Sequence, residues 1–462
     1  MKKIFIIGAG LGAGSITEDA KNALAESSVV LGAERLLSEY ASFIRGKRCV
    51  AKYGAEDVLA AANGAGAETF RGADPAHSAN GAGAETFRGA DPAQSANGAG
   101  AVAVLVSGDP GFYSAALKIC AAFDIKASGG AEAGGAQSGG VEAGDAQNGG
   151  AEEYCVRVIP GISSLNAMFA ALGMPWQDAA LCSMHGKDVN AAEYVRRNRI
   201  AFFLTGKNTA QLSEKLCAAG YEDIKLYVGQ DLGSADQSVI SCTAKELAEK
   251  QLSSLTVIVA ENPDADASVR TGIPDEEFIR GSVPMTKSEV RAVLMSKLGI
   301  KPDMICADIG AGTGSCTAEM ALAAWNGRVY AIDPNPEAVA LIKENCRKLH
   351  IGNVEAREGL APDDIKDLPP LDAAFIGGSK GHMTEIFSEI LGKNPNCRIV
   401  VSSIVLQTLS SALDAFAAFG IEPEVVQIAA AASKRVSGLD MMMARNPIFL
   451  ISGGGKSSRS EG

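Results

Sequence analysis

The chain has 462 residues, a length typical of about three domains. With 42 Lys and Arg against 54 Asp and Glu, its net charge is −12, which argues against a dedicated nucleic-acid binder, because such proteins neutralise phosphates with basic side chains. The ten cysteines occur singly, so we expect reduced thiols. No apolar run is long enough to span a membrane, and we expect a cytoplasmic protein without a membrane or nucleic-acid partner.

The first apolar run, residues 4–7, enters a glycine turn, which indicates a strand and not a signal peptide. Similar short apolar runs follow as far as residue 260, with helical patterns between them. Such alternation predicts an α/β fold with a parallel sheet, whose ligand-binding loops lie at the carboxyl ends of the strands. The predicted strands of this first series are 4–7, 102–106, 155–159, 200–204, 225–228 and 255–260.

Two repetitive tracts interrupt this series. Residues 63–79 recur at 80–96 with His77 replaced by Gln94, and residues 128–151 repeat a Gly-rich unit. Segments so rich in Gly, Ala and Glu cannot bury enough surface to offset the conformational entropy of the chain. We therefore predict disordered insertions at about 63–100 and 128–151, within a first domain that spans residues 1–262.

The first strand runs into Gly8-Ala-Gly10-Leu-Gly12-Ala13, which satisfies the dinucleotide fingerprint G-x-G-x-x-A. A flavin- or NAD-binding first domain is therefore an alternative. Three further short turns, at 107–113, 160–164 and 205–206, also follow predicted strands. Several such loops favour a cofactor folded into a cleft over a single loop around a pyrophosphate. Taken alone, Asp109-Pro110-Gly111 is ordinary turn chemistry.

A polar linker is predicted at 263–271, followed by a second α/β domain at 272–452 and a polar tail at 453–462. One of its strands ends in Gly310, Gly312 and Gly314, and the next ends in Asp333. This arrangement is typical of a nucleoside site. It combines a strand, a tight glycine turn, the start of a helix and a carboxylate that can accept hydrogen bonds from two ribose hydroxyls. The G-x-G-x-G spacing is typical of S-adenosylmethionine (SAM) sites; another nucleotide, or a purely structural turn, is the alternative. The predicted strands are 304–309, 328–332, 354–357, 373–376, 398–402 and 447–451.

The motifs of the two halves resemble known families. The glycine turn with Thr17, the segment Ser107-Gly-Asp-Pro-Gly-Phe-Tyr-Ser114 and Pro160-Gly-Ile-Ser-Ser164 look like the tetrapyrrole methylases of cobalamin synthesis. The second half is similar to the decarboxylating corrin C15-methyltransferases. Together the two halves resemble the fused C5,15-methyltransferases (decarboxylating) whose substrate is precorrin-6Y or the corresponding cobalt-precorrin. The motifs of the second half are GIPDEEFI from Gly272, SVPMTKSEVR from Ser282, DIGAGTG from Asp308, YAIDPNPEA from Tyr330, FIGGS from Phe375 and RNP from Arg445.

The resemblance implies an N-terminal two-lobed tetrapyrrole methylase-like domain and a C-terminal Rossmann-like SAM-dependent methyltransferase domain. The SAM-binding residues that it implies are Gly8, Gly10, Gly12, Gly108, Asp109, Pro110 and Ser163 in the first domain, and Thr286, Gly310, Ala311, Gly312, Thr313, Gly314, Asp333, Gly359 and Ala361 in the second. The chain departs from the family pattern at Ala13-Gly14-Ser15 and at Gln230, where the family has an acidic residue.

The implied function is SAM-dependent methylation of a corrin-precursor tetrapyrrole at C5 and C15, with decarboxylation of the ring C acetate. We expect no catalytic metal, an unidentified catalytic residue and a homo-oligomer. Because the substrate carries many carboxylates, basic side chains near the strand ends are candidates to bind it, and His382 could donate a proton. The candidates are Ser379, Lys380 and Arg445, with His185, Lys187, Arg196, Arg197, Lys207, Lys287, Lys434 and Arg435 as further cations.

One alternative is a SAM-dependent RNA or protein methyltransferase whose N-terminal domain is non-catalytic or binds a dinucleotide. Another is a scaffold that holds a tetrapyrrole without reacting with it. Acidic charge argues against RNA, and glycine turns in both halves argue against a scaffold.

Overall fold

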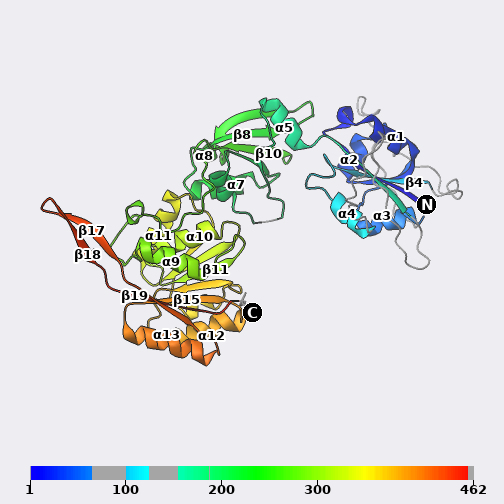
Figure 1. The fold of residues 1–462 in the computed structure, drawn as a ribbon. Helices are drawn as coiled ribbons and strands as arrows, with labels where there is room; N and C mark the ends of the chain where they lie inside the picture. Colours follow the sequence, from blue (N-terminus) through cyan, green and yellow to red (C-terminus); the bar gives the residue numbers. More distant parts are fainter. Residues whose placement is uncertain (1, 65–99, 124–153, 187, 456–462) are drawn as a thin grey trace, which may run out of the picture. The chain divides into compact units, whose positions relative to one another are not determined.

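The computed structural model of the chain describes residues 2–64, 100–123, 154–186 and 188–455 (Figure 1). Two compact units can be distinguished. The first comprises Met1–Asp178, Val228–Ile240 and Ser253–Val257, and the second comprises Ala179–Tyr227, Ser241–Leu252 and Ile258–Gly462. The predicted insertions and tail lie almost entirely outside the described residues, so their disorder stays a prediction.

Five parallel strands form the first sheet, in the order β3-β2-β4-β1-β5. Both faces are apolar: Val102 and Val104 pack in one cluster with Ile4, whereas Ala103 and Leu105 pack in the cluster on the other face. Burial on both faces is what a parallel sheet covered by helices requires. The elements are β1 (Lys2–Gly8), α1 (Glu18–Glu26), β2 (Ser27–Gly32), α2 (Glu34–Glu39), β3 (Arg48–Val50), α3 (Ala55–Ala62), β4 (Ala101–Val106), α4 (Ala116–Ala122), β5 (Tyr154–Ile159) and α5 (Ser164–Leu172).

A second sheet has the order β6-β7-β10-β8-β9. Its strands β6 and β9 were not predicted, because Ala-Leu-Cys-Ser and Ser-Val-Ile-Ser-Cys-Thr mix polar with apolar residues and give no continuous apolar run. The elements are β6 (Ala180–Ser183), α6 (Ala191–Arg197), β7 (Ile200–Leu204), α7 (Thr209–Ala218), β8 (Lys225–Gln230), β9 (Ser238–Thr243), α8 (Ala244–Leu247) and β10 (Thr256–Glu261).

The third sheet has seven strands in the order β13-β12-β11-β14-β15-β19-β16. The first five are parallel, and β19 is antiparallel to both of its neighbours. Helices α9, α10 and α11 cover one face, and α12 and α13 cover the other (Figure 1). All six strands predicted for this half are present. The elements are α9 (Ser288–Leu298), β11 (Ile305–Ile309), α10 (Ser315–Ala323), β12 (Arg328–Asp333), α11 (Pro336–Lys348), β13 (Val354–Glu358), β14 (Ala373–Ile376), α12 (Met383–Lys393), β15 (Arg398–Ser403), α13 (Leu406–Ala418), β16 (Glu424–Ile428) and β19 (Ile448–Gly453).

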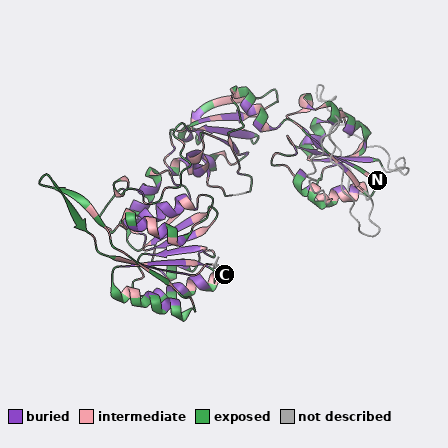
Figure 2. Ribbon diagram, in the orientation of Figure 1, coloured by how far each residue is buried: buried purple, intermediate pink, exposed green. Residues whose placement is uncertain are grey.

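Burial follows this layering. Figure 2 shows buried residues concentrated in the strands and exposed residues on the outer sides of the helices. The predicted α/β class is therefore confirmed, with parallel strands between helices in the first and third sheets.

A two-stranded hairpin, β17 (Ala431–Val436) and β18 (Leu439–Ala444), projects away from the third sheet (Figure 1). Its turn, Ser437-Gly438, has φ of 49° and 86°, as the two-residue turns that fit the twist of a hairpin require. The sequence analysis did not predict this element. It places the candidate cations Lys434 and Arg435 on an exposed ribbon, where Arg435 pairs with Asp440 at 3.0 Å.

Within the second unit, residues 188–222 contact the amino-terminal edge of the third sheet. Arg328, the first residue of β12, pairs with Asp188 at 2.7 Å. His350, which follows α11, stacks on Tyr221 with ring centroids 4.2 Å apart, and its Nδ1 donates to the carbonyl of Ala219 at 3.0 Å. These contacts lie at the sheet edge opposite to the glycine turns, so they leave the carboxyl edge free.

A fully buried ion pair organises the start of the C-terminal domain. Arg291 of α9 and Glu319 of α10 are both 0% exposed, and Arg291 Nε donates to Glu319 Oε1 at 2.7 Å. Glu319 also accepts from the backbone N–H groups of Gly272 and Ile273 at 2.9 Å. Arg291 donates in addition to the carbonyls of Ile273 and Thr286. The pair therefore ties the 272–286 segment to two helices.

Replacing Arg291 with Met should destabilise the chain by about 3–5 kcal/mol, because Glu319 is left buried without its partner. Urea unfolding of the full chain, followed by tryptophan fluorescence, measures the loss. Adding Glu319→Gln to that variant should recover part of it by removing the uncompensated charge. Arg435→Met, which breaks an exposed pair, is the control and should change stability by less than about 1 kcal/mol. Equal stabilities of the two Arg variants would contradict the assignment.

Candidate active sites

Turns at the carboxyl ends of β1, β4 and β5 meet in the first unit. Gly10 and Gly108 form an antiparallel bridge with N···O distances of 3.1 and 3.3 Å. Asp109 accepts from the N–H of Gly161 at 3.2 Å and so joins the second turn to the third. A Cβ placed on Gly8 would lie 2.6 Å from the Gly161 nitrogen, so only glycine permits this approach. The turns picked out from the sequence therefore come together.

A serine holds the first glycine turn in shape. Ser15 Oγ accepts from the N–H of Leu11 at 2.8 Å and donates to the carbonyl of Gly12 at 2.9 Å. This residue lies where the chain departs from the family pattern, and the sequence analysis gave it no role. Gly233 lies against Leu11, where an added Cβ would be 2.4 Å from the leucine Cβ. Gly233 thus borders the same turn.

Ser163, predicted to contact SAM, caps α5. Its Oγ lies 2.6 Å from Asn166 Oδ1 and accepts from the N–H of Asn166 at 3.2 Å. The side chain is buried, with 2% exposed. Its observed role is to start the helix, and the prediction that it also contacts the cofactor stays a prediction.

The second candidate site is a cavity of about 350 Å³ at the carboxyl edge of the third sheet. Its walls come from the turns after β11, β12, β13 and β14, from Ser402 near the end of β15 and from the 283–286 segment. The lining residues are Val283, Pro284, Thr286, Ile309, Gly310, Ala311, Gly312, Cys316, Ile332, Asp333, Pro334, Asn335, Gly359, Leu360, Ala361, Phe375, Gly377, Gly378, Lys380 and Ser402.

The glycine turn gives this cavity a bare backbone wall. Gly310 and Gly312 have φ of 76° and 56°. A Cβ on Gly310 would lie 2.8 Å from the Gly378 nitrogen, and one on Gly312 would lie 2.6 Å from the Pro284 carbonyl oxygen. Positive φ and close neighbours both demand glycine, so a ligand can reach the peptide groups directly.

Asp333 stands at the end of β12 with its carboxylate fixed. Oδ2 accepts from the N–H of Gly312 at 2.9 Å, and Oδ1 accepts from the N–H of Asn335 at 2.9 Å. Each oxygen can accept a second hydrogen bond. The carboxylate is thus oriented to receive two neighbouring hydroxyls, which is the arrangement expected for a ribose.

A second carboxyl group, that of Asp308, precedes the glycine turn by two residues. Asp308, the residue before Ile309 in β11, is fully buried, and Thr317 Oγ1 donates to its Oδ2 at 2.5 Å. Burial raises the pKa of Asp308 to about 7, and the neighbouring charge of Asp333 adds to this. Asp308 was quoted only as part of the DIGAGTG motif, and its burial was not predicted, because burial cannot be inferred from a local pattern.

The structure brings together most of the predicted residues of the second half. Those that line the cavity are Thr286, Gly310, Ala311, Gly312, Asp333, Gly359, Ala361 and Lys380. Thr313, Gly314, Ser379 and Arg445 are not among the lining residues. Gly314 packs on Ile342 at the start of α10, and Arg445 pairs with Glu289. The sequence analysis missed Pro284, Asn335, Phe375 and Ser402, which reach the cavity only through the tertiary fold.

Other candidate cations have structural partners. Arg196 is 7% exposed and pairs with Glu193 at 2.6 Å. Arg197 lies over the Trp325 ring at 4.8 Å, and Lys287 pairs with Asp275 at 3.1 Å. Lys187 lies outside the described residues. His382 is exposed immediately before α12, and its role as a proton donor stays a prediction.

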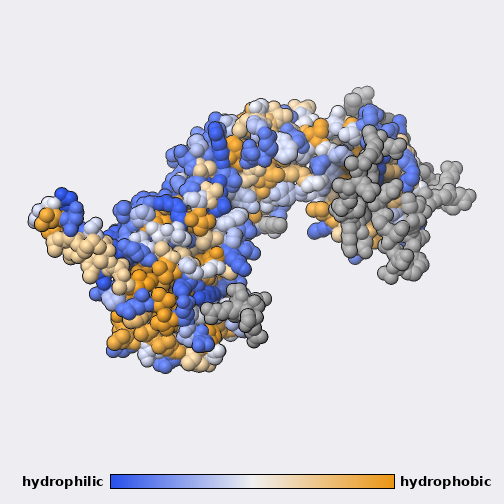
Figure 3. Space-filling view, in the orientation of Figure 1, coloured by the Kyte–Doolittle hydropathy of each residue, from blue (hydrophilic) through white to orange (hydrophobic). Residues whose placement is uncertain are grey.

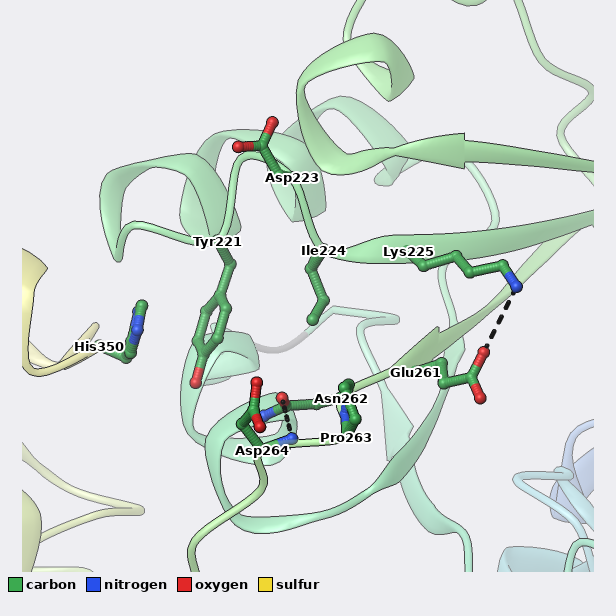
Figure 4. Close-up of a pocket in the computed structure, with 9 residues that line it drawn as sticks. All are labelled: Tyr221, Asp223, Ile224, Lys225, Glu261, Asn262, Pro263, Asp264 and His350. Carbon is green, nitrogen blue, oxygen red and sulfur yellow. Dashed lines mark hydrogen bonds and ion pairs between the residues drawn. The ribbon is translucent and has the colours of Figure 1, made fainter.

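Another cavity, of about 480 Å³, is lined by Tyr221, residues 223–225, residues 261–264 and His350 (Figure 4). Its polar groups are largely engaged with one another. Lys225 pairs with Glu261 at 3.6 Å, and Asn262 Oδ1 accepts from the N–H of Asp264 at 3.1 Å. This cavity therefore offers no clear recognition group.

Two families match the chain. Residues 3–130 and 142–248 match the tetrapyrrole (corrin/porphyrin) methylases, which is more than half of the chain. The chain belongs to the tetrapyrrole methylase family. Residues 277–452 of this tetrapyrrole methylase match the precorrin methyltransferase domain. Membership decides against a flavin- or NAD-binding first domain, and both families indicate SAM-dependent methyl transfer.

Relatives of the C-terminal part carry a more specific name. A "probable cobalt-precorrin-6B C(15)-methyltransferase (decarboxylating)" of Pyrobaculum calidifontis is 38% identical over 183 residues, which is 39% of this chain and 94% of that protein. The protein of the same name from Saccharolobus solfataricus is 40% identical over 190 residues, again covering 39% of this chain and 94% of that protein. A crystal structure of a precorrin-6y C5,15-methyltransferase from Geobacter metallireducens is 34% identical, with a TM-score of 0.38, and covers 40% of this chain and 96% of that one.

Among the residues that the structure describes, none of the helices has the length and apolar character of a membrane span. Within the same residues, no group of three or more His, Cys, Asp and Glu side chains is placed to hold a metal ion.

Replacing Asp333 with Ala should weaken SAM binding at the second site roughly 10- to 100-fold, because hydrogen bonds to a charged group contribute about 1.5–3 kcal/mol each. Calorimetric titration of the full chain with SAM measures this. Asp303→Ala, in an exposed turn before β11, is the control and should leave binding unchanged. Wild-type affinity at both sites in Asp333→Ala would show that the ribose lies elsewhere.

Proposed function

We propose that the chain methylates a corrin-precursor tetrapyrrole at C5 and C15 with SAM and decarboxylates the ring C acetate, as a step of cobalamin biosynthesis. The observation that carries the proposal is that each half has its own glycine-lined site and matches its own family of tetrapyrrole or precorrin methyltransferases. We further propose that residues 1–262 carry out the C5 reaction and 272–452 the C15 reaction with decarboxylation.

We propose that SAM is held by the turns at Gly8–Gly12, Gly108–Pro110 and Ser163 in the first half. In the second half the proposed contacts are Thr286, the 310–314 turn, Asp333, Gly359 and Ala361. The fit to the cavity at the carboxyl edge of the third sheet rests on the bare backbone at Gly310 and Gly312 and on the oriented carboxylate of Asp333. When bound, SAM supplies an electrophilic methyl group on an activated leaving group.

The protein's task is alignment and exclusion of water. Each reacting meso carbon of the reduced tetrapyrrole gives an electron pair to the methyl group and then loses a proton to solvent or to a side chain. The carboxyl group of the ring C acetate leaves as CO₂, its bonding pair passes into the conjugated ring, and the remaining methylene carbon takes up a proton and becomes a methyl group. No strong base is needed first, which agrees with sites built from backbone and not from a nucleophile and a base.

Substrate carboxylates require local cations despite the net charge of −12. Lys380 is the proposed one, because it is exposed and lines the cavity. Its φ of +50° is uncommon for a residue with a side chain, and such backbone strain clusters at functional sites. Ser379 and Arg445 remain weaker proposals as substrate contacts.

A pair of variants tests the division of labour. Gly10→Ala, whose methyl would lie 2.5 Å from Ser15 Oγ, should abolish C5 methylation and spare CO₂ release. Asp333→Ala should lose C15 methylation and CO₂ release and spare C5 methylation. Mass spectrometry of the tetrapyrrole and trapped ¹⁴CO₂ separate the two outcomes. Loss of both reactions in each variant would overturn the assignment of one reaction to each half, and no methylation by the wild type would overturn the function itself.

We also propose a cytoplasmic homo-oligomer that does not bind nucleic acid. All ten cysteines are free, which suits a reducing compartment, and the acidic charge disfavours phosphate backbones. Support for association comes from the β17–β18 hairpin. It exposes 72% of Leu439 and 67% of Met442, and Figure 3 shows pale orange along this ribbon. Exposed apolar surface of this kind marks contact sites.

The double variant Leu439→Asp/Met442→Asp should shift the chain from an oligomer toward the monomer in sedimentation velocity, because two charges would be buried at the contact. Leu117→Asp, an equally exposed position of α4, is the control and should leave the sedimentation coefficient unchanged. A wild-type chain that sediments as a monomer would contradict the proposal.

A further inference from the structure

Three consecutive apolar side chains are exposed to solvent at the carboxyl edge of the third sheet. Ile404 and Val405 join β15 to α13, which begins at Leu406, and the three side chains are 61%, 47% and 69% exposed. Single exposed apolar residues are ordinary, whereas a contiguous group beside a cavity marks a contact surface. We call residues 404–406 the apolar turn.

Hydrogen bonds from one buried serine hold the backbone of the apolar turn. Ser403, which is 5% exposed, donates from Oγ to the carbonyl of Val405 at 2.6 Å and accepts from the N–H of Val405 at 3.1 Å. One buried hydroxyl therefore satisfies both backbone groups of the central residue. The three side chains are held outward by the fold and are not exposed through fraying of α13.

Strand order places the apolar turn on the side of the cavity that lies away from Asp333. Asp333, the proposed ribose partner, ends β12, and the order onward is β12-β11-β14-β15. With strands about 4.8 Å apart, β15 lies roughly 14 Å from β12 along the sheet edge. The cavity itself extends from Asp333 along this edge as far as Ser402 of β15. Ser402, two residues before the turn, still lines the cavity, so the turn continues its wall outward.

Charge and shape agree with one kind of occupant. Lys380, in the turn after β14, lines the same side of the cavity, and among the described side chains none pairs with it. On the opposite flank, Leu360 also lines the cavity and is 40% exposed. An apolar platform beside a free ammonium suits a flat, apolar ring system whose edge carries carboxylates.

We propose that the apolar turn Ile404–Leu406 supports the face of the tetrapyrrole macrocycle during the C15 reaction, with Lys380 at the mouth of the cavity pairing with a ring carboxylate. This inference rests on the proposed function. It assigns the turn a positioning role and makes it a determinant of specificity for a large ring over smaller methyl acceptors.

The test uses the full chain and the double variant Ile404→Ser/Leu406→Ser, which changes only exposed side chains. Titration with cobalt-precorrin-6B and, separately, with precorrin-6Y in the presence of S-adenosylhomocysteine is followed by visible absorbance. We expect at least a roughly tenfold increase in tetrapyrrole Kd, because two apolar side chains that the ring would cover are replaced by polar ones. Affinity for SAM and C5 methylation should be unchanged. Val425→Ser, at a 44% exposed apolar position of β16, is the matched control and should bind like the wild type.

Unchanged tetrapyrrole affinity in the double variant would overturn the inference and leave the proposed function standing. A change in sedimentation without a change in tetrapyrrole Kd would also overturn it, because the turn would then be a contact between copies of the chain. Failure of the wild type to bind either tetrapyrrole would overturn the proposed function and, with it, the inference. A Lys380→Ala variant should raise the Kd with a dependence on salt that the double variant does not share.

Discussion

The C-terminal site depends on the buried pair between Arg291 and Glu319. Neither residue lines the cavity, yet Arg291 donates to the carbonyl of Thr286, and Glu319 accepts from the start of the 272–286 segment. That segment forms the wall facing the glycine turn, and Pro284 comes so close to Gly312 that no side chain fits between them. A buried ion pair gains little stability over an apolar pair. Its value here is geometric, since a guanidinium with several donors can fix a loop that has no regular structure.

Both candidate sites are formed by glycine turns at the carboxyl edge of a parallel sheet. In each, turns from neighbouring parallel strands meet at the carboxyl edge, and glycines let their backbones approach closely. Gly8 against Gly161 in the first unit corresponds in principle to Gly310 against Gly378 in the second. Backbone-lined clefts suit a reaction whose leaving group is already activated, because binding and orientation are then the main requirements. The absence of a catalytic triad from the proposed mechanism follows from this chemistry.

The contacts of residues 188–222 with the third sheet separate structural from catalytic surfaces within the second unit. Arg328 and His350 lie at the amino-terminal edge of the sheet, away from the cavity. Several basic residues that resemble substrate contacts in sequence serve this packing or local ion pairs. Arg197 over Trp325 is an example. A cation is informative about a binding site only once its partners are known.

The sequence by itself determined twelve strands of the two α/β series, the glycine turns and Asp333, because apolar runs, Gly spacing and a carboxylate at a strand end are local patterns with local causes. It left out β2, β3, β6, β9, β16 and the β17–β18 hairpin, which are short or mix polar with apolar residues, although Ser437-Gly438 is a hairpin signal. Only the tertiary structure decided that Asp308 is buried with a raised pKa, that Ser163 caps a helix, and that Pro284 and Ser402 line one cavity. Burial and neighbourhood arise from contacts between residues far apart in the chain, and no local pattern records them.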